Sequence, residues 1–554
     1  MARWKLITLV VLSAVVIVSG ALAHEPTPSN TSEAGSSVPL YDDLGDLTYP
    51  ITTTNTLAQR YFDQGLRLTY AFNHAEARRA FRQAQRLDPH CAMCYWGEAF
   101  VLGPNINAPM DDAAGNPAVA AITKAQALAP QAKAHEQALI HALAKRYAPD
   151  PKAERAALDR TYADAMAEAA RRFPDDDEIA VLYIDSLMNL SPWDYWEADG
   201  TTPKGQIGDA IRTAETVLAR SPDHPGAIHL YIHLTEASTT PERAEPYANR
   251  LAALMPGAGH LVHMPAHTFF RVGRYQDSAD TNKAAVEVDE AYLAKTKAGG
   301  IYRDGYYPHN IHFVLISAQM AGDRQTALEY ARRLEGKISD EAAKRVGWIQ
   351  AILPAPYFAH VQFSTPETIL ALPDPGGKFP FVQAMWHYAR GVAYATQGQV
   401  EQARREAAKI AELHQKTGND YPADLAPVAP DVLRIARHVV EGRIAQAEGD
   451  TERAVKEFEV AIAIQDALPY LEPPFWYYPV RQSLGAALLA AGKTEEAEAA
   501  FQRSLEQFPK SGWALFGLMK AQQAQGKTAA AQETERRFKQ AWAGDTKDLD
   551  LKRL

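Results

Sequence analysis

One order of residues recurs along this chain and constrains its fold: a glycine, a turn, an alanine, a phenylalanine and, in two of the repeats, a proline. The clearest repeats contain Gly65, Ala77, Phe81 and Pro89; Gly442, Ala454 and Phe458; Gly485, Ala497, Phe501 and Pro509. The small residues let two paired helices approach closely, the aromatic ring fills the gap between them, and the proline ends the second helix. Apolar residues follow a helical period nearly throughout, with no convincing alternating pattern of a strand. We therefore predict an all-α chain of stacked helix pairs.

Further repeats have the same spacing. Gly492 and Gly526 lie 34 residues apart, as do Pro222 and Pro256, and Gly391 and Gly398 begin another repeat. Gly273 and Gly322 are typical of the turns between paired helices. This pattern resembles the tetratricopeptide repeat family over most of the chain. The resemblance implies an α-solenoid of helix-turn-helix repeats, curved enough to enclose its groove. It implies little about function, because the family mostly supplies scaffolds.

The N-terminus has the order of an export signal. Arg3 and Lys5 precede an apolar run at residues 6–18, and Ala21 and Ala23 form a small-residue cleavage site. We expect a signal peptide at residues 1–23, a flexible leader at 24–50 that is rich in Pro, Ser and Thr, and a periplasmic or secreted protein. The alternative is an uncleaved anchor, because the apolar stretch is nearly long enough to span a bilayer. No other membrane contact is expected.

Charge and cysteine content narrow the function classes. The formal net charge is −10, with 57 basic and 67 acidic residues, so nothing in the electrostatics favours nucleic acid as a partner. The two cysteines, Cys91 and Cys94, favour a local disulfide or two packed thiols, with redox or metal chemistry as the alternative. The sequence has no Walker A loop, Rossmann fingerprint or metalloprotease H-E-x-x-H motif.

Seven of the 17 histidines are concentrated in one part of the sequence. They are His229, His233, His260, His263, His267, His309 and His312. They fall into three groups along the sequence: residues 229–233, 260–267 and 309–312. Within each group the histidines are three, four or seven residues apart, which places their side chains on one face of a helix. We number the positions within a repeat so that the turn glycines Gly273 and Gly322 fall at position 15, and the three repeats then start at Pro225, Gly259 and Pro308. His260 and His309 then share position 2, His229, His263 and His312 share position 5, and His233 and His267 share position 9. In the family that the chain resembles, these positions line the concave groove.

A grid of histidines on adjacent helices predicts a metal site, since histidine is the commonest metal ligand. Imidazole ligands with few carboxylates suit copper, zinc or iron and argue against magnesium or calcium. We favour copper, and we expect one or more ions in a mono- or multinuclear site, because seven imidazoles exceed the needs of one. Glu236, at position 12, is a candidate general base, with the alternatives of a ligand or an orienting partner of a histidine.

The sequence leaves the activity open. We predict an exported metalloprotein, for which a metal-dependent oxidase is one activity, with a small-molecule substrate or a peptide in the groove. The alternatives are a metal storage or delivery protein and a non-catalytic scaffold for protein or peptide binding. Aromatic residues from flanking loops either cover the groove or pack at loop ends: Trp193, Tyr195, Trp196, Tyr302, Tyr306 and Tyr307. We expect three regions: N-terminal repeats at 51–222, histidine-rich repeats at 223–345 and a C-terminal array at 346–554.

Overall fold

Left-handed glycines separate the helices where the sequence predicts turns. These glycines, with φ between 70° and 80°, are Gly273, Gly322, Gly398, Gly449, Gly492 and Gly526. At Gly322 a side chain is also excluded by space, since an added Cβ would lie 2.3 Å from Trp542. The next residue, Asp323, accepts a hydrogen bond from the backbone N–H of Thr326 and begins the following helix. Turn and cap together fix where one helix ends and the next begins.

The computed structural model describes residues 38–150, 152–296, 298–416 and 421–554. Its helices belong to one compact unit, Leu40–Leu554. The predicted signal peptide, residues 1–23, and residues 24–37 of the predicted leader lie outside the described residues. Among those that are described, no helix is both long and apolar enough to cross a membrane.

The helices follow one another along the chain. The N-terminal ones are α1 Thr56–Tyr70, α2 His74–Leu87, α3 Ala92–Val101, α4 Gly115–Leu128, α5 Ala134–Ala144, α6 Arg155–Arg172, α7 Asp177–Met188 and α8 Ile207–Arg220. The central ones are α9 Pro225–Glu236, α10 Glu245–Leu254, α11 Gly259–His263, α12 Pro265–Arg271, α13 Tyr275–Thr296, α14 Tyr307–Ala321 and α15 Arg324–Leu334.

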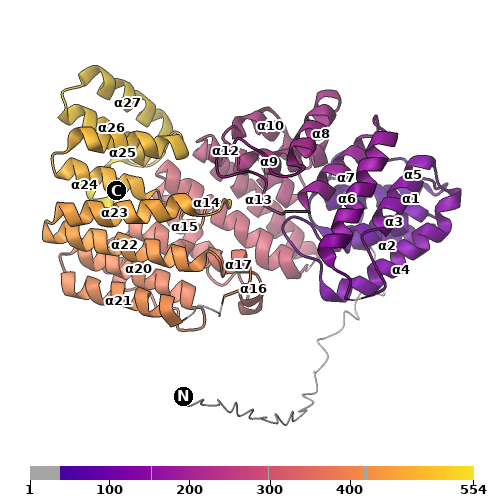
Figure 1. Ribbon diagram of the computed structural model, residues 1–554, viewed down its shortest axis with the longest axis horizontal. Coiled ribbons are helices and arrows are strands. Elements are labelled where there is room, and N and C mark those ends of the chain that lie inside the picture. The colour runs from indigo at the N-terminus through magenta and orange to yellow at the C-terminus, as the bar shows by residue number, and fades with distance from the viewer. Residues whose placement is uncertain (1–37, 151, 297, 417–420) are drawn as a thin grey trace, which may run out of the picture. The chain divides into compact units, whose positions relative to one another are not determined.

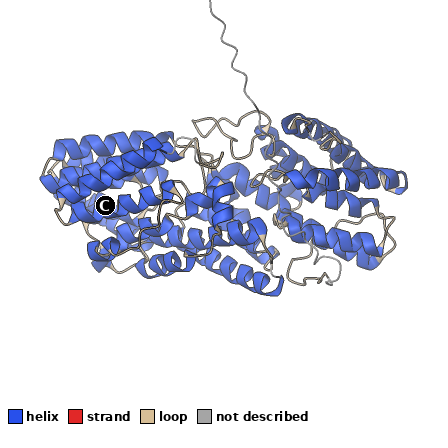
Figure 2. Cartoon of the chain, turned by 90° about the horizontal axis from the view of Figure 1, so that it is seen from below, coloured by secondary structure: helices blue, strands red, loops and turns tan. Residues whose placement is uncertain are grey.

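The remaining helices complete the array. They are α16 Asp340–Arg345, α17 Gly347–Ile352, α18 Ala355–Phe363, α19 Pro366–Leu370, α20 Pro380–Thr396, α21 Val400–Lys416, α22 Ala429–Glu448, α23 Thr451–Ala467, α24 Val480–Ala490, α25 Thr494–Gln507, α26 Gly512–Ala524 and α27 Thr528–Ala541. Each helix mostly packs on the next one, and alternate helices such as α20 and α22 also touch (Figure 1). Figure 2 shows helices and loops throughout, and the described residues contain isolated bridges in place of a strand. The prediction of an all-α solenoid is confirmed.

The predicted packing of aromatic against glycine is present in the outer repeats. A Cβ on Gly65 would lie 2.6 Å from the ring of Phe81, and one on Gly485 would lie 2.7 Å from Phe501. The ring therefore occupies the space that a side chain at the glycine would need. Phe81 and Phe501 are at most 1% exposed.

Two contacts between distant segments make this array more closed than a simple row of helices. Helix α1 packs on α9, and α26 packs on α14. In the second contact the indole Nε1 of Trp513 donates to the carbonyl oxygen of Gln319 over 2.9 Å. The first and last parts of the array are thus both brought to the central helices. This enclosure positions the site described below.

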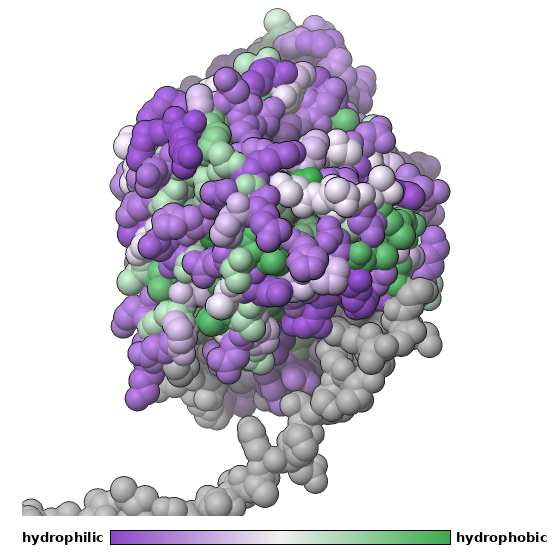
Figure 3. Space-filling view, turned by 90° about the vertical axis from the view of Figure 1, so that its right-hand side faces the viewer, coloured by the Kyte–Doolittle hydropathy of each residue, from purple (hydrophilic) through white to green (hydrophobic). Residues whose placement is uncertain are grey.

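Two segments near the N-terminus differ from free loops. Residues 40–50, which we expected to belong to the flexible leader, lack regular structure but are held by α1: the backbone N–H of Tyr49 donates to Asp63 Oδ1 over 3.0 Å. Cys91 and Cys94 form a disulfide at the start of α3 and are fully buried, as the first alternative predicted. Figure 3 shows the end formed by the N-terminal helices, where hydrophobic residues lie in small groups among hydrophilic ones.

Candidate metal centre

The histidines are carried by three neighbouring segments of the central region. Helix α9 bears His229, His233 and Glu236, the pair α11 and α12 bears His260, His263 and His267, and α14 bears His309 and His312. Pro265 divides α11 from α12, because proline cannot donate the helical hydrogen bond at its position. Helix α12 contacts α9, and α13 contacts α11, α12 and α14. These contacts bring the predicted rows of histidines together.

His229, His233 and His260 form a first group, whose ligand atoms lie within 4.8 Å of one another. The Nδ1 atom of His229 donates to the backbone oxygen of Tyr70 over 2.7 Å. This bond leaves its Nε2 atom with a free electron pair, and that atom lies 3.2 Å from His260 Nε2. The Nε2 atom of His233 and the Nδ1 atom of His260 are buried without a hydrogen-bond partner.

His263, His267 and His309 form a second group of the same kind. The ring centroid of His263 lies 4.7 Å from that of His267 and 4.8 Å from that of His309. The Nδ1 atom of His263 donates to Asn282 Oδ1 over 2.6 Å, and Asn282 itself donates to the backbone oxygen of Ser278. His263 and His267 face each other through their Nε2 atoms, 2.8 Å apart.

Glu236 lies between the two groups. Its Oε1 atom accepts a hydrogen bond from His233 Nδ1, and its Oε2 atom accepts one from His267 Nδ1, each over 2.6 Å. The hydroxyl of Tyr470 also donates to Oε2, over 3.1 Å. With both oxygens engaged, the geometry favours an orienting role over that of a general base, among the three alternatives left open by the sequence.

The electrostatics of the site follow from its burial. Burial, and then repulsion from His229 and His263, lowers the pKa of His260 well below its ordinary value. Burial is also the largest cause of the lowered pKa values of His229, His233, His263 and His309. Burial alone would raise the pKa of Glu236, but His267 and His233 hold it below the usual range. Burial thus favours the neutral form of these five imidazoles, which lie around one carboxylate.

Aromatic side chains pack on both groups. On the second group, the ring of Phe313 lies 5.1 Å from those of His263 and His267. The ring of Phe72 lies 4.5 Å from His229, Trp193 lies 5.1 Å from His233, and Tyr306 lies 4.9 Å from His260. Phe72 and Trp193 have φ values of 52° and 67°, which side-chain-bearing residues rarely adopt. Such strain persists where the surroundings over-determine it and is common at functional sites.

The structure brings six of the seven predicted histidines together and leaves one apart. His312 is 5% exposed, neither of its ring nitrogens has a partner, and its ring lies 6.0 Å from Tyr477. It belongs to neither group of three. Its position in the repeat matches His229 and His263, but α14 faces a loop of the C-terminal region at that level. Register alone therefore does not bring His312 into either group of three, and its role as a metal ligand stays a prediction.

Of the six aromatic residues considered for the cover, Trp193 and Tyr306 contact histidines. The others make separate bonds or lie buried: Trp196 donates to Leu234 O, Tyr302 to Asp289, Tyr307 to Glu290, and Tyr195 is buried. Sequence reasoning missed Phe72, Asn282 and Tyr470. Asn282 left a signal, since it stands where the repeat pattern has an aromatic residue.

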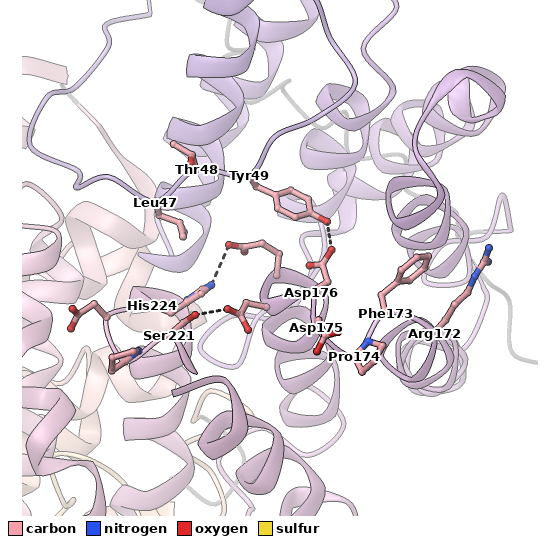
Figure 4. A pocket seen from close by; sticks show the side chains of 14 residues that line it. Leu47, Thr48, Tyr49, Arg172, Phe173, Pro174, Asp175, Asp176, Ser221 and His224 are labelled. Atoms are coloured by element: carbon pink, nitrogen blue, oxygen red, sulfur yellow. Dashed lines mark hydrogen bonds and ion pairs between the residues drawn. The ribbon is translucent and has the colours of Figure 1, made fainter. Parts of the chain in front are cut away.

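A larger pocket lies on the far side of the N-terminal end of α9 (Figure 4). Its volume is about 810 Å³, and acidic side chains line much of it: Asp175, Asp176, Asp177, Glu178 and Asp223. Tyr49 donates to Asp176 over 3.0 Å, and His224 lies 3.2 Å from Glu178 (Figure 4). Tyr70 links this pocket to the centre, because its hydroxyl donates to Glu178 while its backbone oxygen accepts from His229.

One segment of the chain is similar to a known repeat family. Residues 488–536, which include α25 and α26, match the family model of the tetratricopeptide repeat. A tetratricopeptide repeat is thus identified over these residues, and the stacked helix pairs of the rest of the described chain are of the same all-helical type. No curated protein matches the chain.

Two solved structures of helical repeat proteins are similar to this chain at low sequence identity. The human IFIT1 dimer with m7Gppp-AAAA is 13% identical, with 88% of this chain and 91% of that chain covered and a TM-score of 0.33. Yeast Tom70 is 12% identical, with 88% and 93% covered and a TM-score of 0.29. Likenesses of this size transfer neither a ligand nor an activity to this chain.

Proposed function

We propose that this protein binds transition-metal ions through its two groups of three histidines, which we call the α9 triad (His229, His233, His260) and the α12 triad (His263, His267, His309). The observation that carries the proposal is the 2.8 Å contact between the Nε2 atoms of His263 and His267. Their Nδ1 atoms point at Asn282 Oδ1 and at the carboxylate of Glu236, which accept only.

The hydrogen bonds of these two rings require a cation between them or beside them. Because both Nδ1 atoms donate, neutral rings present two electron pairs to each other at this distance. A proton on His263 would relieve the repulsion, but burial lowers the pKa of His263 well below its ordinary value and so disfavours that state. A metal ion bound to both Nε2 atoms uses the same electron pairs, and acceptors on the opposite nitrogens are the usual support of metal-bound histidines.

The ligands favour copper, with zinc and iron as alternatives. Imidazole is a suitable ligand for all three metals. Among the divalent ions of the first transition row, copper(II) binds most tightly to a site of nitrogen ligands. Three protein ligands per ion leave a coordination position open, as at catalytic sites rather than closed structural ones. This opening supports an enzyme such as an oxidase over metal storage. The N-terminal sequence supports an exported protein, periplasmic or secreted.

Metal content tests the proposal. Protein purified from the periplasm, and metal-free protein incubated with copper, zinc or iron and then desalted, should contain metal by elemental analysis. His263→Ala should lower occupancy most, because its ring contacts both other rings of the α12 triad. The matched control is His438→Ala, since His438 also bonds a carboxylate, Glu457, over 2.7 Å but lies outside the centre.

The two results that overturn the proposal are a chain that takes up none of the three metals, and an occupancy that is the same in His263→Ala and His438→Ala. Circular dichroism should show equal helical content for both variants. If the chain binds no metal, the remaining function is that of a scaffold for protein or peptide binding, which the repeat fold supports. The acidic pocket of about 810 Å³ is then the place where a peptide with basic side chains would bind.

A further inference from the structure

We infer that the two triads form one dinuclear centre, whose pair of ions binds a ligand of one to three non-hydrogen atoms between them. This inference rests on the proposed function and goes beyond it, because two triads could also hold two independent ions. Three observations carry it: the triads are contiguous, one carboxylate joins them, and aromatic rings pack on both of them.

The triads touch along two edges. The ring centroids of His233 and His267 lie 5.5 Å apart, and those of His260 and His263 lie 5.8 Å apart. Each of these pairs joins one ring of the α9 triad to one ring of the α12 triad. His233 and His267, with Glu236, also form a third set of ligand atoms within 4.8 Å of one another. Two ions held by these rings would be neighbours, with Glu236 beside both triads.

Glu236 couples the positions of the two triads. Its two oxygens hold one histidine each, His233 from the α9 triad and His267 from the α12 triad. The side chain is 1% exposed, and Tyr470 holds it from a segment 234 residues away in the sequence. A shift of one triad therefore displaces the carboxylate that orients the other. This is the arrangement expected of a pair of ions acting on one ligand.

The surroundings set the size of that ligand. Aromatic rings pack on both triads, with Phe72, Trp193 and Tyr306 on the α9 triad and Phe313 on the α12 triad. Dioxygen, hydroxide and azide are of a size to enter with small side-chain movements, whereas an aromatic substrate would require Phe72, Trp193 or Tyr306 to leave. The inferred ligand class is therefore a small molecule or anion that bridges two ions.

Electron paramagnetic resonance of the copper-loaded full chain tests the inference. We expect two copper ions per chain by elemental analysis, and a copper(II) signal that accounts for less than half of them, because neighbouring spins couple. His263→Ala should bind one copper with a signal of full intensity. Azide should change the visible absorption of the unmodified chain, and the bulkier benzoate should leave it unchanged.

Glu236→Gln is the second variant, since it retains the shape of the side chain and removes its charge. In this variant the copper(II) resonance signal should account for most of the bound copper. In His438→Ala it should account for less than half, as in the unmodified chain. The inference is overturned by one copper per chain, or by two whose signals add up to two isolated ions. It is also overturned if benzoate and azide act alike. Absence of copper, zinc and iron would instead refute the proposed function.

Discussion

The hairpin of α24 and α25 and the hairpin of α12 and α13 place different residues at the same point of the repeat. In the first, Phe501 packs on Gly485, sixteen residues before it. In the second, the same interval joins Ala266 and Asn282, and Asn282 orients His263. A ring that fills the space between two helices has thus been replaced by an amide that holds a ligand.

The difference shows what a functional repeat requires. An aromatic wedge contributes apolar burial to the stability of its hairpin. A buried amide costs free energy unless its polar atoms are bonded, and here Ser278 O and His263 Nδ1 supply the partners. At this position the residue of the C-terminal repeat therefore stabilises its hairpin, whereas the residue of the central repeat orients a histidine. Four predictions test this comparison.

Removal of the wedge should have the largest effect. Phe501→Ala leaves a cavity between α24, α25 and α26, and we expect a loss of about 3–5 kcal/mol in the free energy of unfolding. Metal occupancy should be unchanged, because Phe501 lies in a separate core with Trp513 and Leu518. Urea unfolding followed by circular dichroism measures the first quantity. A loss below about 1 kcal/mol would show that the wedge is dispensable.

Removal of the orienting amide should weaken metal binding. Asn282→Leu keeps the volume but deprives His263 of its acceptor, and we expect a fall in copper affinity of about 10–100-fold. The matched control is Gln482→Leu, because Gln482 is equally buried and bonds Ser511 in the C-terminal region. Competition with a chromophoric chelator measures both affinities. Equal affinities in the two variants would remove the functional reason for Asn282.

The isolated histidine should make stability depend on pH. Burial lowers the pKa of His312 to about 3, below its ordinary value of 6.5. Below pH 6.5 the unfolded chain binds a proton that the folded chain does not, so stability present above this pH is lost as the pH falls towards 3. His312→Leu in the metal-free chain should lessen that loss by about 1 kcal/mol per pH unit at most. Unfolding curves at pH 7 and 5 measure it; an equal loss in both chains would contradict the account.

The cost of a substitution at a turn glycine should depend on the space around it. Gly492→Ala places a side chain in open space at φ 76°, and we expect a cost of about 1–2 kcal/mol from the left-handed backbone alone. Gly273→Ala in the central region should cost more, because its Cβ would lie 2.0 Å from the backbone oxygen of Pro509. The two melting temperatures give the comparison, and the opposite order would contradict it.

The sequence predicted what depends on local pattern. The turn glycines and the wedge Phe501 follow from repeat spacing, and the same register placed six histidines together. It could not place His312, whose surroundings come from Tyr477 in a distant segment. Phe72 and Tyr470 were missed for the same reason: they reach the site through contacts between helices far apart in the chain, such as α1 with α9.

The return of distant segments to the centre has a consequence for how the chain unfolds. In an ordinary repeat array each repeat contacts only its neighbours, so stability is a sum of local contributions and either end can melt first. Here Phe72, near the beginning of the array, stacks on His233, and Tyr470, towards its end, donates a hydrogen bond to Glu236. Fraying of either end opens the same central layer. Ions bound there would accordingly increase the cooperativity of the whole array.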